Sequence, residues 1–160
     1  SIHTLSSARV GSIHRWCDVP GFNSWNFYHC NIDERAIKQI ATILKSSGLA
    51  AKGYRYVNID DCWQVAREPG TGVIVPDPAR TPRLETSHVL CQHWAGCQDM
   101  RVAAGFPSGL KAIASWLHER DMRFGVYTAA HGTTCQDRPG SYLYEKIDSA
   151  SYCEWGVDYL

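Results

Sequence analysis

The sequence predicts an α/β fold in which parallel strands alternate with helices. Three observations carry this prediction: a helix with regular apolar spacing, two short runs rich in β-forming residues, and the order of these segments along the chain. Strands that alternate with helices are typically parallel and joined by crossover helices. Two architectures fit, an open doubly wound sheet and a (β/α)8 barrel. A glycine-rich phosphate fingerprint after the first strand would favour the open sheet, and the sequence contains none.

The first strand and helix are predicted between residues 21 and 48. A short strand over 21–25 precedes a helix that Asn31 or Asp33 can cap and that Gly48 ends. The helix is marked by four apolar residues at i, i+3, i+4 and i+7, which are Ile37, Ile40, Ala41 and Leu44. This is the spacing of an amphipathic helix.

The second strand is predicted over 54–59, where the residues YRYVNI alternate and are rich in β-formers. It ends on the four residues DDCW at 60–63, and the glycines and prolines of 70–78 then predict a loop. Further along, we expect a helix over 108–121, a strand over 122–127, a helix over 144–155 and the start of a strand over 157–160.

Residues 81–105 break this rhythm, since they have neither helical nor strand periodicity. The spacing of His88, Cys91, His93 and Cys97 could mimic a zinc site. A structural zinc site needs convergent geometry, and the segment shows no framework for it. We therefore favour a disordered loop or translated non-coding sequence, and we predict no metal.

Composition excludes several classes of function. Lys plus Arg and Asp plus Glu are equal at 16 each, which gives no support for nucleic-acid or membrane-surface binding. No apolar run is long enough to cross a membrane. Seven cysteines favour an oxidising compartment with at least one disulfide. Residues 1–19 have neither a starting Met nor the apolar core of a signal peptide, and with the abrupt end at Leu160 they lead us to expect a fragment.

The candidate functional residues follow the predicted strands. In a parallel barrel, the C-terminal strand ends carry function, and here they hold Trp25, Asp60, Asp61 and Tyr127. Adjacent carboxylates are costly unless they accept hydrogen bonds, which sugar hydroxyls can donate while a Trp face covers the ring. In the simpler interpretation, Asp60 caps the next element, Asp61 is solvated and Tyr127 packs in the core.

Neighbouring residues of a strand point to opposite sides, so Asp60 and Asp61 are interpreted as binding residues rather than an acid and nucleophile pair. His131 follows the strand that ends at Tyr127, and we assign it no role. Cys30 and Cys62 follow the first two strands, so a disulfide could join the two loops.

Several ordered motifs resemble glycoside hydrolase family 27, the α-galactosidases. They cover most of 20–160 apart from 81–105. The motifs are GFNSWN at 21–26, CN at 30–31, GYRYVNIDDCW at 53–63, FPSGLK at 106–111, FGVY at 124–127, TC at 134–135, PGS at 139–141 and WGVDYL at 155–160.

The resemblance implies the N-terminal half of a (β/α)8 TIM barrel, truncated, from an enzyme that hydrolyses terminal α-galactosides with retention of configuration. It implies that Trp25, Asp60, Asp61 and Tyr127 line the galactose pocket. It also implies that a disulfide joins Cys30 and Cys62, as in the family. No metal or organic cofactor is implied, since two carboxylates suffice for this chemistry. The expected location is secreted or lysosomal/vacuolar. We make no prediction about the oligomeric state.

This chain also departs from the family pattern. The family nucleophile belongs to a Lys-x-Asp motif expected just beyond Leu160, and the acid/base Asp would lie further on. The polypeptide as given is therefore predicted to be inactive. Cys135 loses its family partner by truncation, and Ala129 replaces a residue that is usually acidic.

We expect residues 1–19 to be an off-pattern extension and 20–160 to be the barrel portion. The segment 81–105 is an atypical insertion, hypothesised to be a retained intron or a gene-model error. Alternative functions are an α-N-acetylgalactosaminidase and a non-catalytic galactose-binding fragment or pseudoenzyme.

Overall fold

A three-stranded parallel sheet forms the centre of the molecule. The computed structural model describes residues 20–78 and 105–160. The sheet has the order β1-β2-β5, with strands β1 (Gly21–Asn23), β2 (Tyr56–Ile59) and β5 (Arg123–Val126). Its neighbouring strands are joined by helical segments, so the predicted α/β class with parallel strands is confirmed.

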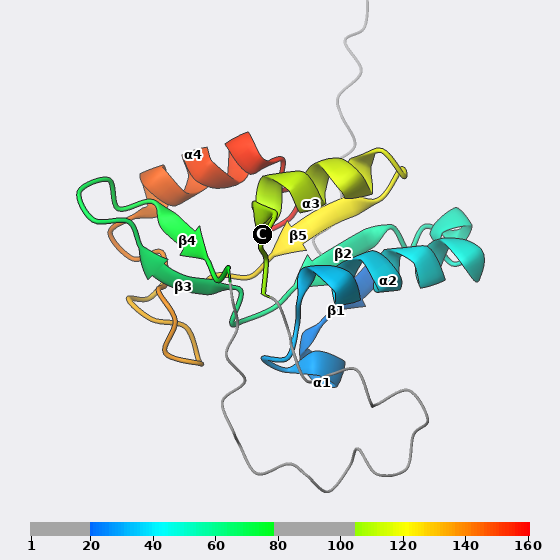
Figure 1. Cartoon of the computed structure of the whole chain (residues 1–160), viewed down its shortest axis with the longest axis horizontal. Helices are drawn as coiled ribbons and strands as arrows, with labels where there is room; N and C mark the ends of the chain where they lie inside the picture. Colours follow the sequence, from blue (N-terminus) through cyan, green and yellow to red (C-terminus); the bar gives the residue numbers. More distant parts are fainter. Residues whose placement is uncertain (1–19, 79–104) are drawn as a thin grey trace, which may run out of the picture.

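Three helices accompany the sheet: α2 (Glu34–Ser46), α3 (Gly109–His118) and α4 (Glu145–Trp155). Helices α2 and α3 lie together along one side of the sheet (Figure 1). The predicted cap of α2 is Asp33, whose side chain accepts a hydrogen bond from the Ala36 N–H at 2.7 Å. That bond satisfies one of the amides that a helix start leaves unpaired.

The two faces of the sheet differ in character. In β2, Val57 and Ile59 are fully buried in the core that α2 and α3 complete, whereas Tyr56 and Asn58 are partly exposed on the other face. Successive residues of a strand point to opposite faces, so Asp60 continues the partly exposed row. Gly125 of β5 lies beside this row, where an added Cβ would meet the Asn58 Oδ1 atom at 2.0 Å. Only glycine fits there.

A β-hairpin stands where a loop is predicted over 70–78. Strands β3 (Gln64–Arg67) and β4 (Ile74–Pro76) pair antiparallel, and Gly70 and Gly72 between them have φ of 85° and 74°. The glycines do mark a turn, but the flanking strands are too short to show a period. Arg67 then anchors the hairpin to α4 through a double hydrogen bond with Asp148, at 2.7 Å for each pair of atoms.

The ends of the sheet differ in detail from the prediction. Strand β1 ends at Asn23 rather than Trp25, because Ser24 precedes a one-turn helix, α1 (Trp25–Tyr28). The predicted strand over 157–160 forms only an isolated parallel bridge, between Tyr159 and Gly125.

Asp158 reinforces this junction between the C-terminal segment and β5. Its carboxylate accepts hydrogen bonds from the Phe124 N–H at 2.9 Å and from Arg123 at 3.0 Å, and it lies 2.6 Å from His118 Nε2. Burial raises the pKa of Asp158, but these hydrogen bonds outweigh burial and hold the pKa below its ordinary value.

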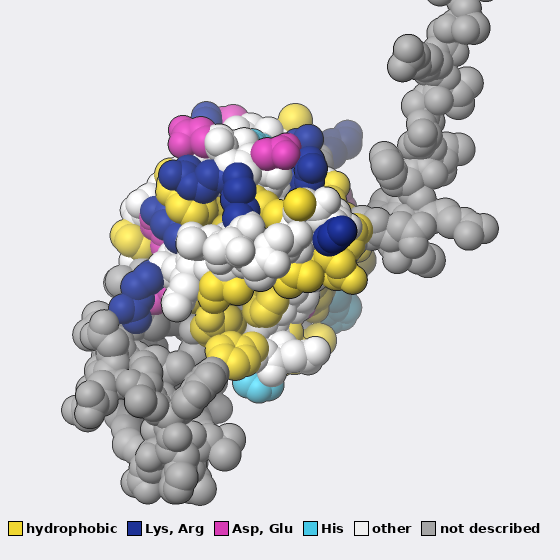
Figure 2. All heavy atoms as spheres, turned by 90° about the vertical axis from the view of Figure 1, so that its right-hand side faces the viewer, with side chains coloured by type: hydrophobic (Ala, Val, Ile, Leu, Met, Phe, Trp, Pro, Cys, Tyr) yellow, Lys and Arg dark blue, Asp and Glu magenta, His cyan; other side chains and the backbone are white. Residues whose placement is uncertain are grey.

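His88, Cys91, His93 and Cys97, whose spacing could mimic a zinc site, lie outside the described residues, as does nearly all of 81–105. Within the described residues, no cluster of three metal-ligating side chains occurs and no helix could span a membrane. Lys and Arg side chains predominate over acidic ones on the face shown in Figure 2, although the formal net charge of the whole chain is zero.

Candidate functional site

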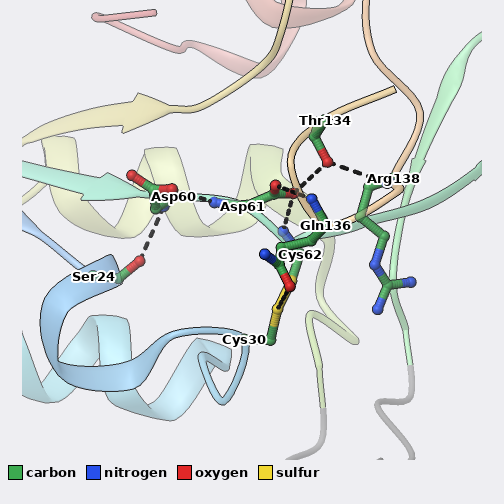
Figure 3. The surroundings of a disulfide bond; sticks show 8 residues. All are labelled: Ser24, Cys30, Asp60, Asp61, Cys62, Thr134, Gln136 and Arg138. Carbon is green, nitrogen blue, oxygen red and sulfur yellow. Dashed lines mark hydrogen bonds between the residues drawn. A yellow bond between two sulfur atoms is a disulfide. The ribbon is translucent and has the colours of Figure 1, made fainter. Parts of the chain in front are cut away.

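Asp60 lies immediately after β2 and is partly exposed. Its Oδ2 atom accepts a hydrogen bond from Asn23 Nδ2 at 2.8 Å, and its Oδ1 atom accepts one from the Asp61 N–H at 2.8 Å. The Asp60 N–H donates to the buried hydroxyl of Ser24 at 3.0 Å (Figure 3). The end of β1 and the residue after it therefore supply two of the three contacts that orient Asp60, and the partly exposed carboxylate can accept further donors.

Asp61 is 2% exposed, and protein donors surround its carboxylate. The Oδ1 atom accepts from the Cys62 N–H and from Thr134 Oγ1, both at 2.7 Å, and the Oδ2 atom accepts from the Gln136 N–H at 3.0 Å (Figure 3). Each of the two adjacent carboxylates thus accepts a hydrogen bond from the backbone N–H of the next residue. These amide dipoles offset the repulsion between two neighbouring negative charges.

A disulfide joins Cys30 and Cys62, with the two Cα atoms 5.3 Å apart, as predicted. It connects the loop after α1 to the loop after β2 (Figure 3). Cys62 has a φ of 76°, a conformation that is costly for a residue with a Cβ atom. Such a conformation persists where its surroundings hold it, and here the disulfide and the Asp61 carboxylate do so.

Tyr127 follows β5 and is partly exposed. The indole N–H of the buried Trp63 donates to the Tyr127 carbonyl at 2.8 Å, and the Tyr127 hydroxyl lies 3.8 Å from Cys135 Sγ. Burial, contact with Cys135 and the charges of Asp61 and Asp60 raise the pKa of Tyr127 to about 12. The hydroxyl therefore stays protonated at neutral pH and can donate a hydrogen bond.

Trp25 is the first residue of α1 and is partly exposed. Its N–H donates to Asn23 Oδ1 at 2.8 Å, and the amide of the same Asn23 side chain contacts Asp60. The structure thus places Tyr127 within the electrostatic influence of Asp60 and Asp61, and it connects Trp25 to Asp60 through Asn23. His131, to which we assign no role, is exposed.

Four residues that support the site were not predicted from the sequence: Asn23, Ser24, Thr134 and Gln136. The first three lie inside motifs that were identified, so position in a motif was the available signal. Their roles depend on contacts between segments 36 to 75 residues apart, which spacing does not show.

Cys135 is free and exposed, and so is Cys153 on α4. A separate cleft is lined by Ala41, Thr42, Lys45, Ser46 and Arg120. Because Arg120 comes before β5 and Tyr127 after it, this cleft lies toward the opposite end of the sheet from the predicted site. It contains none of the predicted residues.

The chain matches known proteins along most of its length. Residues 17–97 and 97–160 match the family described as alpha galactosidase A. The sequence is 38% identical over 141 residues to an alpha-galactosidase of Cyamopsis tetragonoloba, a match that covers 88% of this chain and 28% of that relative. The chain therefore spans less than a third of the length of this relative.

Solved structures agree. The fold is similar to that of alpha-galactosidase I from Mortierella vinacea, with a TM-score of 0.70, 33% identity, and coverage of 88% of this chain and 29% of that one. It is also similar to alpha-galactosidase from Saccharomyces cerevisiae with raffinose, with a TM-score of 0.71, 28% identity, and coverage of 88% and 25%. The chain therefore belongs to the alpha galactosidase A family of glycosidases, the glycoside hydrolase family 27 that its motifs resemble.

Proposed function

We propose that this chain provides the galactose-binding part of the active site of a retaining α-galactosidase. Residues 20–160 would form the N-terminal half of its (β/α)8 barrel, interrupted by the insertion at 81–105. Support for the barrel comes from the parallel order β1-β2-β5 and from the similarity to solved α-galactosidases. The raffinose in one of those structures supports an α-galactoside as the substrate.

The observation that carries the proposal is the Asp60 carboxylate at the C-terminal end of β2. It is partly exposed and is held on both oxygens, by Asn23 Nδ2 and by the Asp61 N–H. A carboxylate with this support is a fixed acceptor for sugar hydroxyls. Tyr127 supplies a protonated hydroxyl nearby, and Trp25 supplies an aromatic ring on the adjacent α1.

The mechanism implied by the family is a double displacement with one nucleophilic and one acid/base carboxylate. Neither role is assigned to a residue of this chain, so Trp25, Asp60, Asp61 and Tyr127 bind and orient the sugar. We infer that the 160-residue polypeptide binds galactose without hydrolysing galactosides. The Cys30–Cys62 disulfide supports an oxidising location, secreted or lysosomal/vacuolar.

Titration calorimetry with galactose tests the binding role of Asp60. An Asp60→Asn variant should weaken galactose binding by about 10-fold or more, because a charge-assisted hydrogen bond becomes a neutral one. The matched control is Asp121→Asn, since Asp121 is 71% exposed, pairs with Arg55 on the surface and precedes β5. This control should leave the affinity unchanged.

Galactose carries an axial hydroxyl at the carbon where glucose carries an equatorial one. Glucose should therefore bind at least about 10-fold more weakly, because a charged acceptor of the site is left unpaired. Equal affinity for the two sugars, or an unchanged affinity in Asp60→Asn, would contradict the proposed site. Stronger binding of N-acetylgalactosamine than of galactose would favour the alternative glycosidase. Turnover of an α-galactoside by the 160-residue polypeptide would refute its predicted inactivity.

A further inference from the structure

The segment after β5 forms a tight turn around Thr134, which is 5% exposed. The Thr134 N–H donates to the Arg138 carbonyl at 2.8 Å, and the Asp137 N–H donates to the Thr134 carbonyl at 3.1 Å. The Arg138 N–H donates to Thr134 Oγ1 at 3.1 Å. Backbone and side chain of Thr134 thus both hold the turn, and its hydroxyl is fixed in place.

This hydroxyl is directed at Asp61 (Figure 3). Because Thr134 Oγ1 accepts from the Arg138 N–H, its own hydrogen is available to donate to Asp61 Oδ1, at 2.7 Å. The same turn supplies the Gln136 N–H to Asp61 Oδ2 at 3.0 Å. Two of the three donors on the Asp61 carboxylate therefore come from a turn that is 73 to 75 residues away in sequence.

We propose that Thr134 is a positioning residue, which orients the Asp61 carboxylate for sugar recognition. This inference rests on the proposed galactose site. A carboxylate offers about four acceptor positions, and three are occupied here. Oδ1 accepts two hydrogen bonds and Oδ2 accepts one, so one acceptor position on Oδ2 is left, and we assign it to a sugar hydroxyl. Without Thr134, the carboxylate can rotate and Oδ1 competes for the same hydroxyl.

Three variants of the protein at its full natural length test this role. Thr134→Val keeps the shape of the side chain but removes the hydroxyl, whereas Thr134→Ser keeps the hydroxyl and loses one methyl group. Thr133→Val is the matched control, because Thr133 is the exposed neighbour of the same turn. Galactose affinity is measured by calorimetry, and hydrogen exchange is followed at the Gln136 and Arg138 amides.

We expect Thr134→Val to weaken galactose binding about 10-fold, the effect of losing one hydrogen bond to a charged group. Thr134→Ser should restore the affinity to within about 3-fold, and Thr133→Val should match the wild type. Exchange of the two amides should speed up in Thr134→Val alone, which confirms that the turn has loosened.

The outcomes separate this inference from the proposed function. If the wild type binds galactose and Thr134→Val binds it equally well, the positioning role is wrong while the sugar site stands. If Thr134→Ser is as weak as Thr134→Val, the hydroxyl is not sufficient and the methyl group is needed as well, which also overturns a role that the hydroxyl carries. A wild type that binds no galactose overturns the proposed function and this inference together, even where exchange differs among the variants.

Discussion

Removal of residues 81–105 should leave the fold intact. One hydrogen bond joins the two chain segments that flank residues 79–104. The Phe106 N–H donates to the Asp77 carbonyl at 2.8 Å. The deletion leaves three residues between Asp77 and Phe106. The bond then joins residues i and i+4, which is the spacing of one helical turn. Pro78 suits the start of such a turn because its ring fixes φ near the helical value.

The expected change in stability can be estimated from two opposing effects. The connection between Asp77 and Phe106 shortens from 28 residues to three, which lowers the entropic cost of loop closure by about 2 kcal/mol. Deletion also removes Gly105, whose carbonyl accepts the Glu34 N–H at 3.0 Å, a loss of about 1 kcal/mol. The net gain of about 1 kcal/mol corresponds to a rise in Tm of roughly 2–6 °C.

Scanning calorimetry and urea unfolding, followed by Trp fluorescence, measure this change. The matched control deletes residues 79–103, which are equally many, and keeps Gly105 with its hydrogen bond to Glu34. We expect this control to be more stable than the 81–105 deletion by about 1 kcal/mol. A loss of more than about 3 kcal/mol in both deletions, or loss of cooperative unfolding, would show that the segment belongs to the fold and refute the reasoning.

Four further predictions concern the anchors of the fold and the origin of the insertion. Asp148→Asn should lower the free energy of unfolding by about 3–5 kcal/mol, because the Arg67 guanidinium, only 13% exposed, loses the buried carboxylate that neutralises it. A loss below about 1 kcal/mol in urea titrations would contradict this. Replacing Cys30 and Cys62 together by Ser should lower the free energy of unfolding by about 3–4 kcal/mol, since the disulfide spans 32 residues. Equal urea midpoints for this variant and the wild type would contradict the prediction. The lowered pKa of Asp158 gives a stabilisation that is complete above its ordinary value of 3.8 and lost as pH falls through the folded-state value. Asp158→Asn should therefore differ most from the wild type near neutral pH and converge with it in acid, as acid unfolding curves will show. Finally, the transcript should join Arg80 directly to Phe106, and a mature transcript that encodes 81–105 would refute the intron hypothesis.

Local patterns were sufficient to predict most regular elements. The apolar stripe of α2 and the cap at Asp33 depend on spacing within one turn, so they are readable before folding. The hairpin β3–β4 was missed because its strands are only four and three residues long. The start of α1 at Trp25 was missed for a similar reason, since one turn of helix has no period to detect.

By itself, the sequence determined the α/β class and the family, because motif order is a property of the chain. The sugar-binding role of the four residues at the strand ends stays a prediction. The Cys30–Cys62 pair was also predicted, since both residues follow adjacent parallel strands. Only the tertiary structure distinguished the partly exposed Asp60 from the buried Asp61, and only it brought Thr134 to the Asp61 carboxylate. These differences arise from donors that approach across the sheet from distant segments, and a hydrogen bond depends on distance in space, which local sequence does not encode.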